Sequence, residues 1–206
     1  MNAIIGYTAL MEKHWGEKEV TAGYLQKLKE AGNFLMDLIG NILEVARIES
    51  GKETLTETAW NLCNLEDTLD LLLDRDIYKK QLTLKKNMEL QHPKVYCDVL
   101  KIQEITMNLL SNAVKYTPEG GTIHFTIREL PYEREGYALF QTVVEDTGIG
   151  ISKEYIPHLF EAFSREKSSS ESGIIGTGLG LRIVKKFVDL MEGSIVVESE
   201  IGEGTR

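Results

Sequence analysis

Apolar residues recur at helical spacing through roughly the first fifty positions of this chain. From Tyr24 to Glu49 they alternate between steps of 4 and 3 residues, which predicts a long helix with one apolar face. This seam consists of Tyr24, Leu28, Ala31, Leu35, Leu38, Ile42 and Val45. A similar stripe precedes it, formed by Met1, Ile4, Ile5, Thr8, Met11 and Trp15. The polar join at 16–23 is short, so the two helices are expected to form an antiparallel hairpin.

A hairpin of this size cannot bury both apolar stripes by itself. We expect residues 1–52 to pair with a second copy in a dimeric four-helix bundle. Packing of the hairpin on its own neighbouring domain is the alternative. No capping Ser, Thr or Asp precedes the first helix, so we expect the chain to begin inside a longer helix.

Beyond residue 52 the pattern becomes an irregular mixture of helix and strand signals. Four segments carry helix signals: one beginning at Asn64, one from Asp98 to about Lys115, 152–160 and 181–191. Four segments carry strand signals: 82–90, 122–130, 137–146 and 194–200. The fold class is therefore α+β, with an α/β sandwich after the hairpin and helices on one face of a mixed sheet. We expect residues 53–206 to form this second domain, with its last strand missing.

Composition narrows the possible partners and location. The 206 residues are 42% hydrophobic and carry a formal net charge of -9, which disfavours binding to nucleic acid or to an anionic membrane. No apolar run approaches the ~20 residues of a membrane helix, and the N-terminus has no signal-peptide pattern. We expect no direct membrane contact and a cytoplasmic location. Cys63 and Cys97 lack metal-ligand spacing.

A polar stripe runs through the apolar helix predicted after Asp98. Glu104, Asn108, Asn112 and Lys115 recur at i, i+4, i+8 and i+11, which places them on one narrow face. Buried amides need hydrogen-bond partners, and neighbouring backbone groups are one source of them. The alternative is a ligand face, because amide oxygens suit Mg²⁺ and a lysine provides a point charge for phosphate.

The sequence EDTGIGI follows the strand predicted at 137–146. Strand alternation places Asp146 on the same face as Phe140 and Val144, so its carboxylate is expected to point inward. A buried carboxylate needs donors, and a purine amino group is a suitable one. Gly148 and Gly150 permit a close backbone approach. The alternative is an ordinary turn with Asp as its first residue.

Glycines alternate at Gly176, Gly178 and Gly180, immediately before the last predicted helix. The dinucleotide-binding fingerprint fails here, because no strand precedes the glycines and Leu181 stands where another spaced glycine should fall. What remains is a glycine-rich entry to a helix N-terminus, a position that attracts anions. We expect the Ser-rich segment 164–173 to act as a lid or loop over a ligand.

The order and spacing of these motifs resemble those of the sensor histidine kinases, within the ATPase superfamily that includes gyrase and related chaperones. NLLSNAVKYT resembles the family's N box, DTGIG its G1 box, FEAF its F box and GTGLGL its G2 box. ESEIGEGT resembles the final glycine-rich box, and the hairpin resembles the dimerisation and phosphotransfer domain. The resemblance covers essentially the whole chain. It implies a homodimer with ATP and Mg²⁺ as cofactors, and a parent protein that is often membrane-anchored.

The resemblance also implies a role for each matched residue. Asn112 matches the position that binds Mg²⁺, Asn108 the position that assists it, and Asp146 the carboxylate that reads adenine. The other ATP-binding residues implied are Lys115, Tyr116, Gly148, Gly150, Arg165, Gly176, Thr177, Gly178, Leu179 and Gly180. Glu104 lies one turn before Asn108 and is a further catalytic candidate.

The family transfers the γ-phosphoryl group of ATP to a histidine on the hairpin, and then to an aspartate on the receiver domain of a response regulator. Gyrase-like relatives carry Glu where this chain has Asn108, and an amide cannot act as a base, so a kinase is favoured over a hydrolase. The family histidine has a His-(Glu/Asp)-x-x-(Thr/Asn)-Pro context. The histidines of this chain lack it: His14, His92, His124 and His158. We therefore expect ATP–Mg²⁺ binding without autophosphorylation; the alternative is a non-catalytic dimeric scaffold gated by nucleotide.

Overall fold

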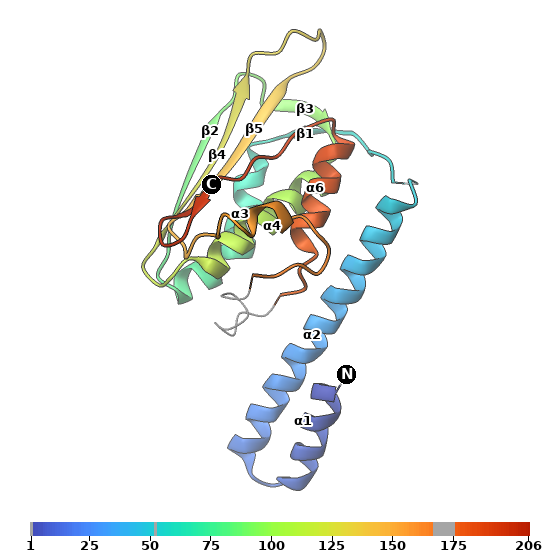
Figure 1. Cartoon of the computed structure of the whole chain (residues 1–206), viewed down its shortest axis with the longest axis vertical. Coiled ribbons are helices and arrows are strands. Elements are labelled where there is room, and N and C mark those ends of the chain that lie inside the picture. The colour runs from blue at the N-terminus through green and yellow to red at the C-terminus, as the bar shows by residue number, and fades with distance from the viewer. Residues whose placement is uncertain (1, 52, 167–175) are drawn as a thin grey trace.

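A helical hairpin and an α/β domain make up the computed structural model, which describes residues 2–51, 53–166 and 176–206 (Figure 1). The hairpin consists of α1 (Asn2–Lys13) and α2 (Lys18–Glu49). The join between them is shorter than predicted, because α2 begins at Lys18 rather than near Tyr24. The α+β fold class is confirmed.

The face of α1 that packs on α2 overlaps the predicted stripe in part: Ile4 and Met11 are half-buried there, together with Tyr7 and His14, which lie outside the stripe. Tyr7 stacks on Tyr24 with their ring centroids 6.3 Å apart, and the His14 ring lies 5.9 Å from that of Tyr24. Ile5 and Trp15, which the pattern placed in the seam, are 62% and 81% exposed. Aromatic packing along Tyr7 and His14 therefore contributes to the seam of α1. Neither helix contains a fully buried residue, so the hairpin leaves much apolar surface uncovered within this chain.

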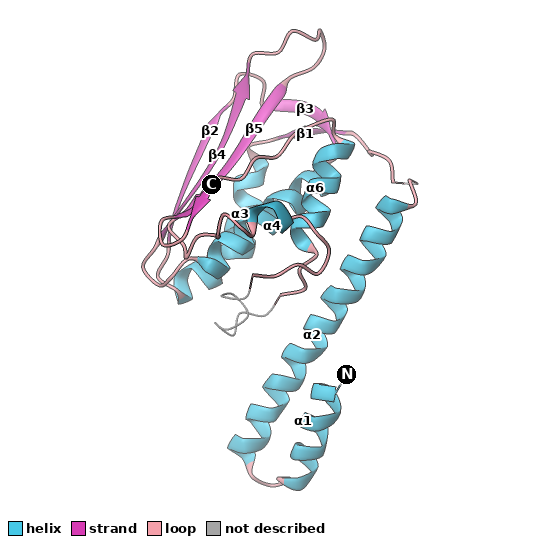
Figure 2. Cartoon of the chain, in the orientation of Figure 1, coloured by secondary structure: helices cyan, strands magenta, loops and turns pink. Residues whose placement is uncertain are grey.

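Three helices cover one face of a five-stranded mixed sheet (Figure 2). The helices are α3 (Asn64–Lys79), α4 (Val99–Tyr116) and α6 (Gly180–Leu190). The strands are β2 (Thr83–Glu89), β4 (Thr122–Leu130), β5 (Leu139–Asp146), β6 (Ser199–Glu200) and β7 (Gly204–Thr205). Their order is β2-β4-β5-β7-β6, with β2 and β4 parallel and the other neighbours antiparallel. This arrangement confirms the predicted helices on one face of a mixed sheet.

Four short elements differ from the sequence expectation. The strands β1 (Thr58–Asn61) and β3 (Lys94–Cys97) form a separate antiparallel pair that is too short to give a readable pattern. The helix expected at 152–160 shrinks to the 3₁₀ turn η1 (Ile156–His158), because Pro157 would stand inside the longer helix without an N–H group to bond the Lys153 carbonyl. The strand expected at 194–200 is reduced to β6, because its partner β7 offers only two residues for pairing.

The hydrophobic core lies between the helices α3 and α4 and the inner face of β4. Leu65 and Leu69 recur at i, i+4 on α3 and are fully buried there. Leu110 of α4 and Phe125 of β4 join the same cluster without any exposed surface. Each such side chain contributes roughly 1.5–3 kcal/mol through burial, so the core holds α4 firmly against the sheet.

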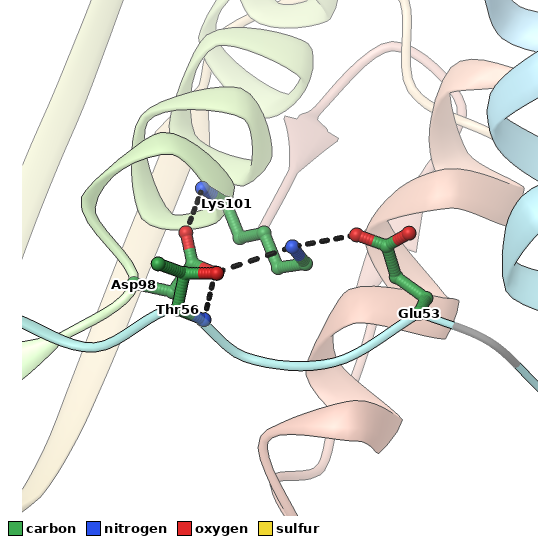
Figure 3. Close-up of polar contacts among 4 residues, drawn as sticks. All are labelled: Glu53, Thr56, Asp98 and Lys101. Atoms are coloured by element: carbon green, nitrogen blue, oxygen red, sulfur yellow. Dashed lines mark hydrogen bonds and ion pairs between the residues drawn. The ribbon is translucent and has the colours of Figure 1, made fainter.

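A buried polar network ties the linker after α2 to the first turn of α4 (Figure 3). Asp98 caps α4 as predicted, and its carboxylate accepts hydrogen bonds from the N–H groups of Lys101 at 3.1 Å and Thr56 at 2.8 Å. The Lys101 ammonium lies 3.2 Å from the Asp98 carboxylate and 2.8 Å from that of Glu53. Lys101 therefore joins the linker to the helix that carries the polar stripe.

Opposing effects act on the pKa of Asp98. Burial raises it, but hydrogen bonds from the backbone of Thr56 and Lys101, together with the Lys101 charge, outweigh burial and hold the pKa below its usual value. A carboxylate with a lowered folded-state pKa stabilises the fold above its ordinary pKa. That stabilisation disappears as the pH falls through the folded-state pKa.

Replacing Asp98 by Ala should lower the free energy of unfolding by about 2–4 kcal/mol at pH 7, because the variant loses a helix cap and one partner of a buried ion pair. Urea denaturation should show the difference from wild type shrinking below about pH 4. Asp74→Ala, at an exposed position on α3, is the matched control and should change little. An Asp98→Ala difference that does not depend on pH would contradict this assignment.

Candidate functional site

The polar stripe of α4 lines a large cleft that extends from α2 across the α/β domain to β5. The cleft brings together most of the residues predicted from the sequence: Glu104, Asn108, Asn112, Lys115, Tyr116, Asp146, Gly150, Arg165, Gly176, Thr177, Gly178 and Gly180. Gly148 lies beside it in contact with Asp146, whereas the Leu179 side chain is 1% exposed and packs inside the domain. Leu179 therefore packs beneath the glycine loop, in the core of the domain, and does not line the cleft.

The two amides of α4 are used differently. Asn108 donates from Nδ2 to the carbonyl oxygen of Glu104 at 3.0 Å, so backbone satisfies that half of the amide. Its Oδ1 atom points toward the start of α6, where a Cβ on Gly180 would approach it to 2.5 Å. The Asn112 amide makes no hydrogen bond to another residue in the described part of the chain. Two amide oxygens thus lie on the cleft side of one helix, where a hard cation such as Mg²⁺ finds suitable ligands.

Asp146 ends β5 on the strand face that packs toward the core, as strand alternation predicted. Its Oδ1 accepts a hydrogen bond from the Gly148 N–H at 2.8 Å. Burial raises the pKa of Asp146, and the charge of Glu145 adds to the rise, while backbone hydrogen bonds from Gly148 and Thr205 oppose it. A half-buried carboxylate beside a cleft is a strong acceptor for an amino group on a ligand.

Glycines allow the two loops around the cleft to pack closely. A Cβ on Gly150, whose φ is 70°, would overlap the backbone of Glu200. Gly178 has a φ of 69°, and its carbonyl accepts a hydrogen bond from the Phe163 N–H at 2.9 Å. A side chain at Gly176 would come within 2.5 Å of the Lys115 ammonium. Replacement of these glycines would therefore fill the cleft or displace its walls.

Positive charge gathers where the glycine loop meets α4. Burial lowers the pKa of Lys115, and the nearby Arg165 guanidinium lowers it further. Two cations held close together in a partly buried place favour an anionic ligand, because an anion relieves both their repulsion and their desolvation. Glu104 is affected in the opposite direction: burial raises its pKa, and the charge of Glu44 on α2 raises it again.

The hairpin contributes contacts that the sequence did not indicate. Asn41 of α2 donates from Nδ2 to the Thr177 hydroxyl of the glycine loop at 3.2 Å. Glu49, at the end of α2, forms an ion pair with Arg182 of α6. Asn41 and Thr177 are 136 positions apart and Asn41 belongs to no motif, so only the folded chain reveals the contact. The lid predicted at 164–173 lies mostly outside the described residues.

Residues 97–206 match the family described as histidine kinase-, DNA gyrase B-, and HSP90-like ATPase. Over 210 aligned residues the chain is 36% identical to the sensor protein GacS of Pseudomonas syringae pv. syringae, covering 100% of this chain and 22% of GacS. It is 29% identical to the autoinducer 2 sensor kinase/phosphatase LuxQ of Vibrio vulnificus, covering 100% of this chain and 24% of LuxQ. The chain thus spans only a minor part of these curated relatives.

Solved structures show the same arrangement of hairpin and α/β domain. Full-length ShkA in complex with AMPPNP matches 90% of this chain and 37% of ShkA, with a TM-score of 0.73 and 26% identity. ThkA in complex with the response regulator TrrA matches 98% of this chain and 54% of ThkA, with a TM-score of 0.71 and 24% identity. The second likeness establishes the fold alone. Within the described residues, no helix combines the length and apolar character needed to cross a membrane.

Replacing Asp146 by Asn should leave the ligand-free protein at least as stable as wild type at pH 7. The variant removes a charge that burial disfavours and keeps an oxygen for the Gly148 N–H. Because the folded-state pKa of Asp146 is raised, wild type should gain stability relative to the variant as the pH falls toward about 4. Thermal denaturation from pH 8 to 4 measures this trend, with the exposed Glu154→Gln as control. A marked loss of stability in Asp146→Asn at pH 7 would contradict it.

Proposed function

Because this chain belongs to the family of histidine kinase-, DNA gyrase B- and HSP90-like ATPases, we propose that it is the ATP-binding kinase core of a sensor histidine kinase. The observation that carries the proposal is the convergence, in one cleft, of an acceptor carboxylate, two helical amides, two cations and a glycine loop. When bound, ATP supplies the γ-phosphoryl group and Mg²⁺ neutralises charge on the phosphate oxygens.

Asp146 would bind the adenine amino group, since its carboxylate is partly buried and already oriented by the Gly148 N–H. Such a bond to a charged acceptor contributes about 1.5–3 kcal/mol to binding. The glycine at position 150 would leave room for the flat base. The adenine base would therefore lie at the β5 side of the cleft.

The phosphates would lie between α4 and the start of α6. Asn112 would ligate Mg²⁺ and Asn108 would assist, because amide oxygens are hard ligands and phosphate oxygens can complete the octahedral shell. Lys115 and Arg165 would neutralise phosphate charge, which explains why the fold keeps them close together. The N-terminus of α6 offers free N–H groups to the same phosphates.

The phosphoryl acceptor in this proposal is a histidine in the family's sequence context, and none of His14, His92, His124 and His158 has that context. A receiver aspartate of a response regulator would accept the group next. Relatives named as sensor kinases support this class of partner, and ThkA has been solved with the regulator TrrA. Glu104 remains a candidate to orient the reacting groups, since it lines the cleft one turn before Asn108.

Calorimetric titration with the ATP analogue AMP-PNP tests the proposed site. Wild type should bind more tightly with Mg²⁺ than without it. Asp146→Asn should weaken binding about 10- to 100-fold by removing the charged acceptor. Asn112→Ala should remove most of the Mg²⁺ dependence, whereas Asn87→Ala, an exposed amide on β2, should bind like wild type.

Absence of binding to folded wild type would refute the ATP site and favour the scaffold alternative. A separate assay with ATP tests for hydrolysis. If wild type releases phosphate steadily from ATP and Asn108→Ala abolishes that release, the result would instead support a hydrolase. Tight Mg²⁺-dependent binding without such release is the result expected of a kinase core.

We further propose that the hairpin pairs with a second copy of this chain. Ile5, Ile39 and Leu43 are 62%, 45% and 56% exposed on its surface, and a four-helix bundle would cover such side chains. Sedimentation should therefore detect a dimer that Ile39→Glu weakens by at least about tenfold in Kd. Leu71→Glu, at an apolar position on α3 that is 84% exposed, is the control and should remain dimeric. A monomeric wild type at all concentrations would contradict the proposal.

A further inference from the structure

The carboxyl end of α4 is held by a lysine from another element. Lys80, the C-cap residue of α3, extends its ammonium to three carbonyl oxygens at this end. It donates to Val114 at 2.7 Å, Lys115 at 3.0 Å and Thr117 at 2.6 Å. These bonds use all three donors of the ammonium group.

The local sequence explains why this helix end needs an outside donor. Thr117 is the C-cap, and the proline after it keeps Thr117 extended, with φ −79° and ψ 128°. The common glycine C-cap, which turns the backbone to satisfy the last carbonyls, is therefore not used. A cation also interacts favourably with the negative end of the helix dipole. Lys80, which lies at the end of α3, thus supplies the hydrogen bonds that a C-cap residue of α4 would provide.

The other carbonyls of this turn also have partners. Thr117 donates to the Ala113 carbonyl from its N–H at 2.9 Å and its hydroxyl at 2.6 Å. The Tyr116 carbonyl accepts from the Ile149 N–H at 3.3 Å, in the loop that follows Asp146. Lys80 is fixed in turn, because its own carbonyl accepts from the Gly120 N–H at 3.0 Å. Each carbonyl from 113 to 117 is therefore engaged.

This turn connects the two halves of the cleft. Lys115 reaches from it toward Gly176 on the phosphate side of the cleft. Tyr116 holds the loop on the Asp146 side through its backbone carbonyl. Because the Ile149 N–H, and not Lys80, holds the Tyr116 carbonyl, loss of Lys80 would chiefly release the Lys115 side of this turn.

We propose that Lys80 is a positioning residue for nucleotide binding, which acts by fixing the last turn of α4 and hence the Lys115 ammonium. The inference rests on the proposed function and adds to it a residue outside the cleft. Lys80 does not line the cleft, so it would act through Lys115 rather than by touching the ligand.

A double-mutant cycle tests this role with AMP-PNP and Mg²⁺ as the probe. Lys80→Met should weaken binding about tenfold, and Lys115→Met should weaken it at least as much. The affinity of the double variant should be at most about twofold lower than that of Lys115→Met, because Lys80 has no further effect once the Lys115 ammonium is gone. Lys79→Met, at the exposed neighbouring position, is the matched control and should bind like wild type.

A purely structural cap would give different results. It would lower the unfolding temperature of Lys80→Met but leave the affinity of the folded variant unchanged, or make the two substitutions additive; either result overturns the inference. If Lys80→Met does not fold, Lys80→Gln, which retains one donor group, replaces it in the same cycle. No binding to wild type would overturn the proposed function and this inference together, whereas normal wild-type binding with an unaffected Lys80 variant overturns this inference alone.

Discussion

The fixed position of α4 is the constraint on which the rest of the site depends. Its apolar side is buried against the sheet, and its polar side faces a cleft. Residues from other elements hold both ends: the N-cap Asp98 and Lys101 also bind the linker at the first turn, and Lys80 spans the carbonyls of the last. A helix clamped at both ends presents its amides with little freedom, which is what binding through a few oxygen ligands requires.

Two contacts connect the hairpin and its linker to the cleft. The linker residue Glu53 pairs with Lys101 at the start of α4, and Asn41 of α2 touches Thr177 in the glycine loop. A displacement of α2 would therefore shift both the start of α4 and the glycine loop. In the proposed sensor kinase, such contacts would carry a displacement of the hairpin to the proposed nucleotide site.

The sequence predicted the parts of the structure that depend on local periodicity. The bounds of β4 agree at 122–130, and the Asp98 cap and the shared face of Asn108 and Asn112 follow from helical spacing. Features that depend on long-range contacts were not predicted: Tyr7 and His14 join the seam of α1 by packing on Tyr24, and β1 and β3 are too short to show alternation. The contacts of Lys80 have no signature in sequence, because its three acceptors lie 34 to 37 positions away.

A crystal structure of the protein with AMP-PNP and Mg²⁺ would test the central claim most directly. The account predicts the adenine amino group within hydrogen-bonding distance of the Asp146 carboxylate, and Mg²⁺ bound to the Asn112 amide oxygen and to phosphate. The Lys115 ammonium should lie beside the phosphates, on a turn still capped by Lys80. A nucleotide bound outside this cleft, or an adenine that does not contact Asp146, would contradict the account.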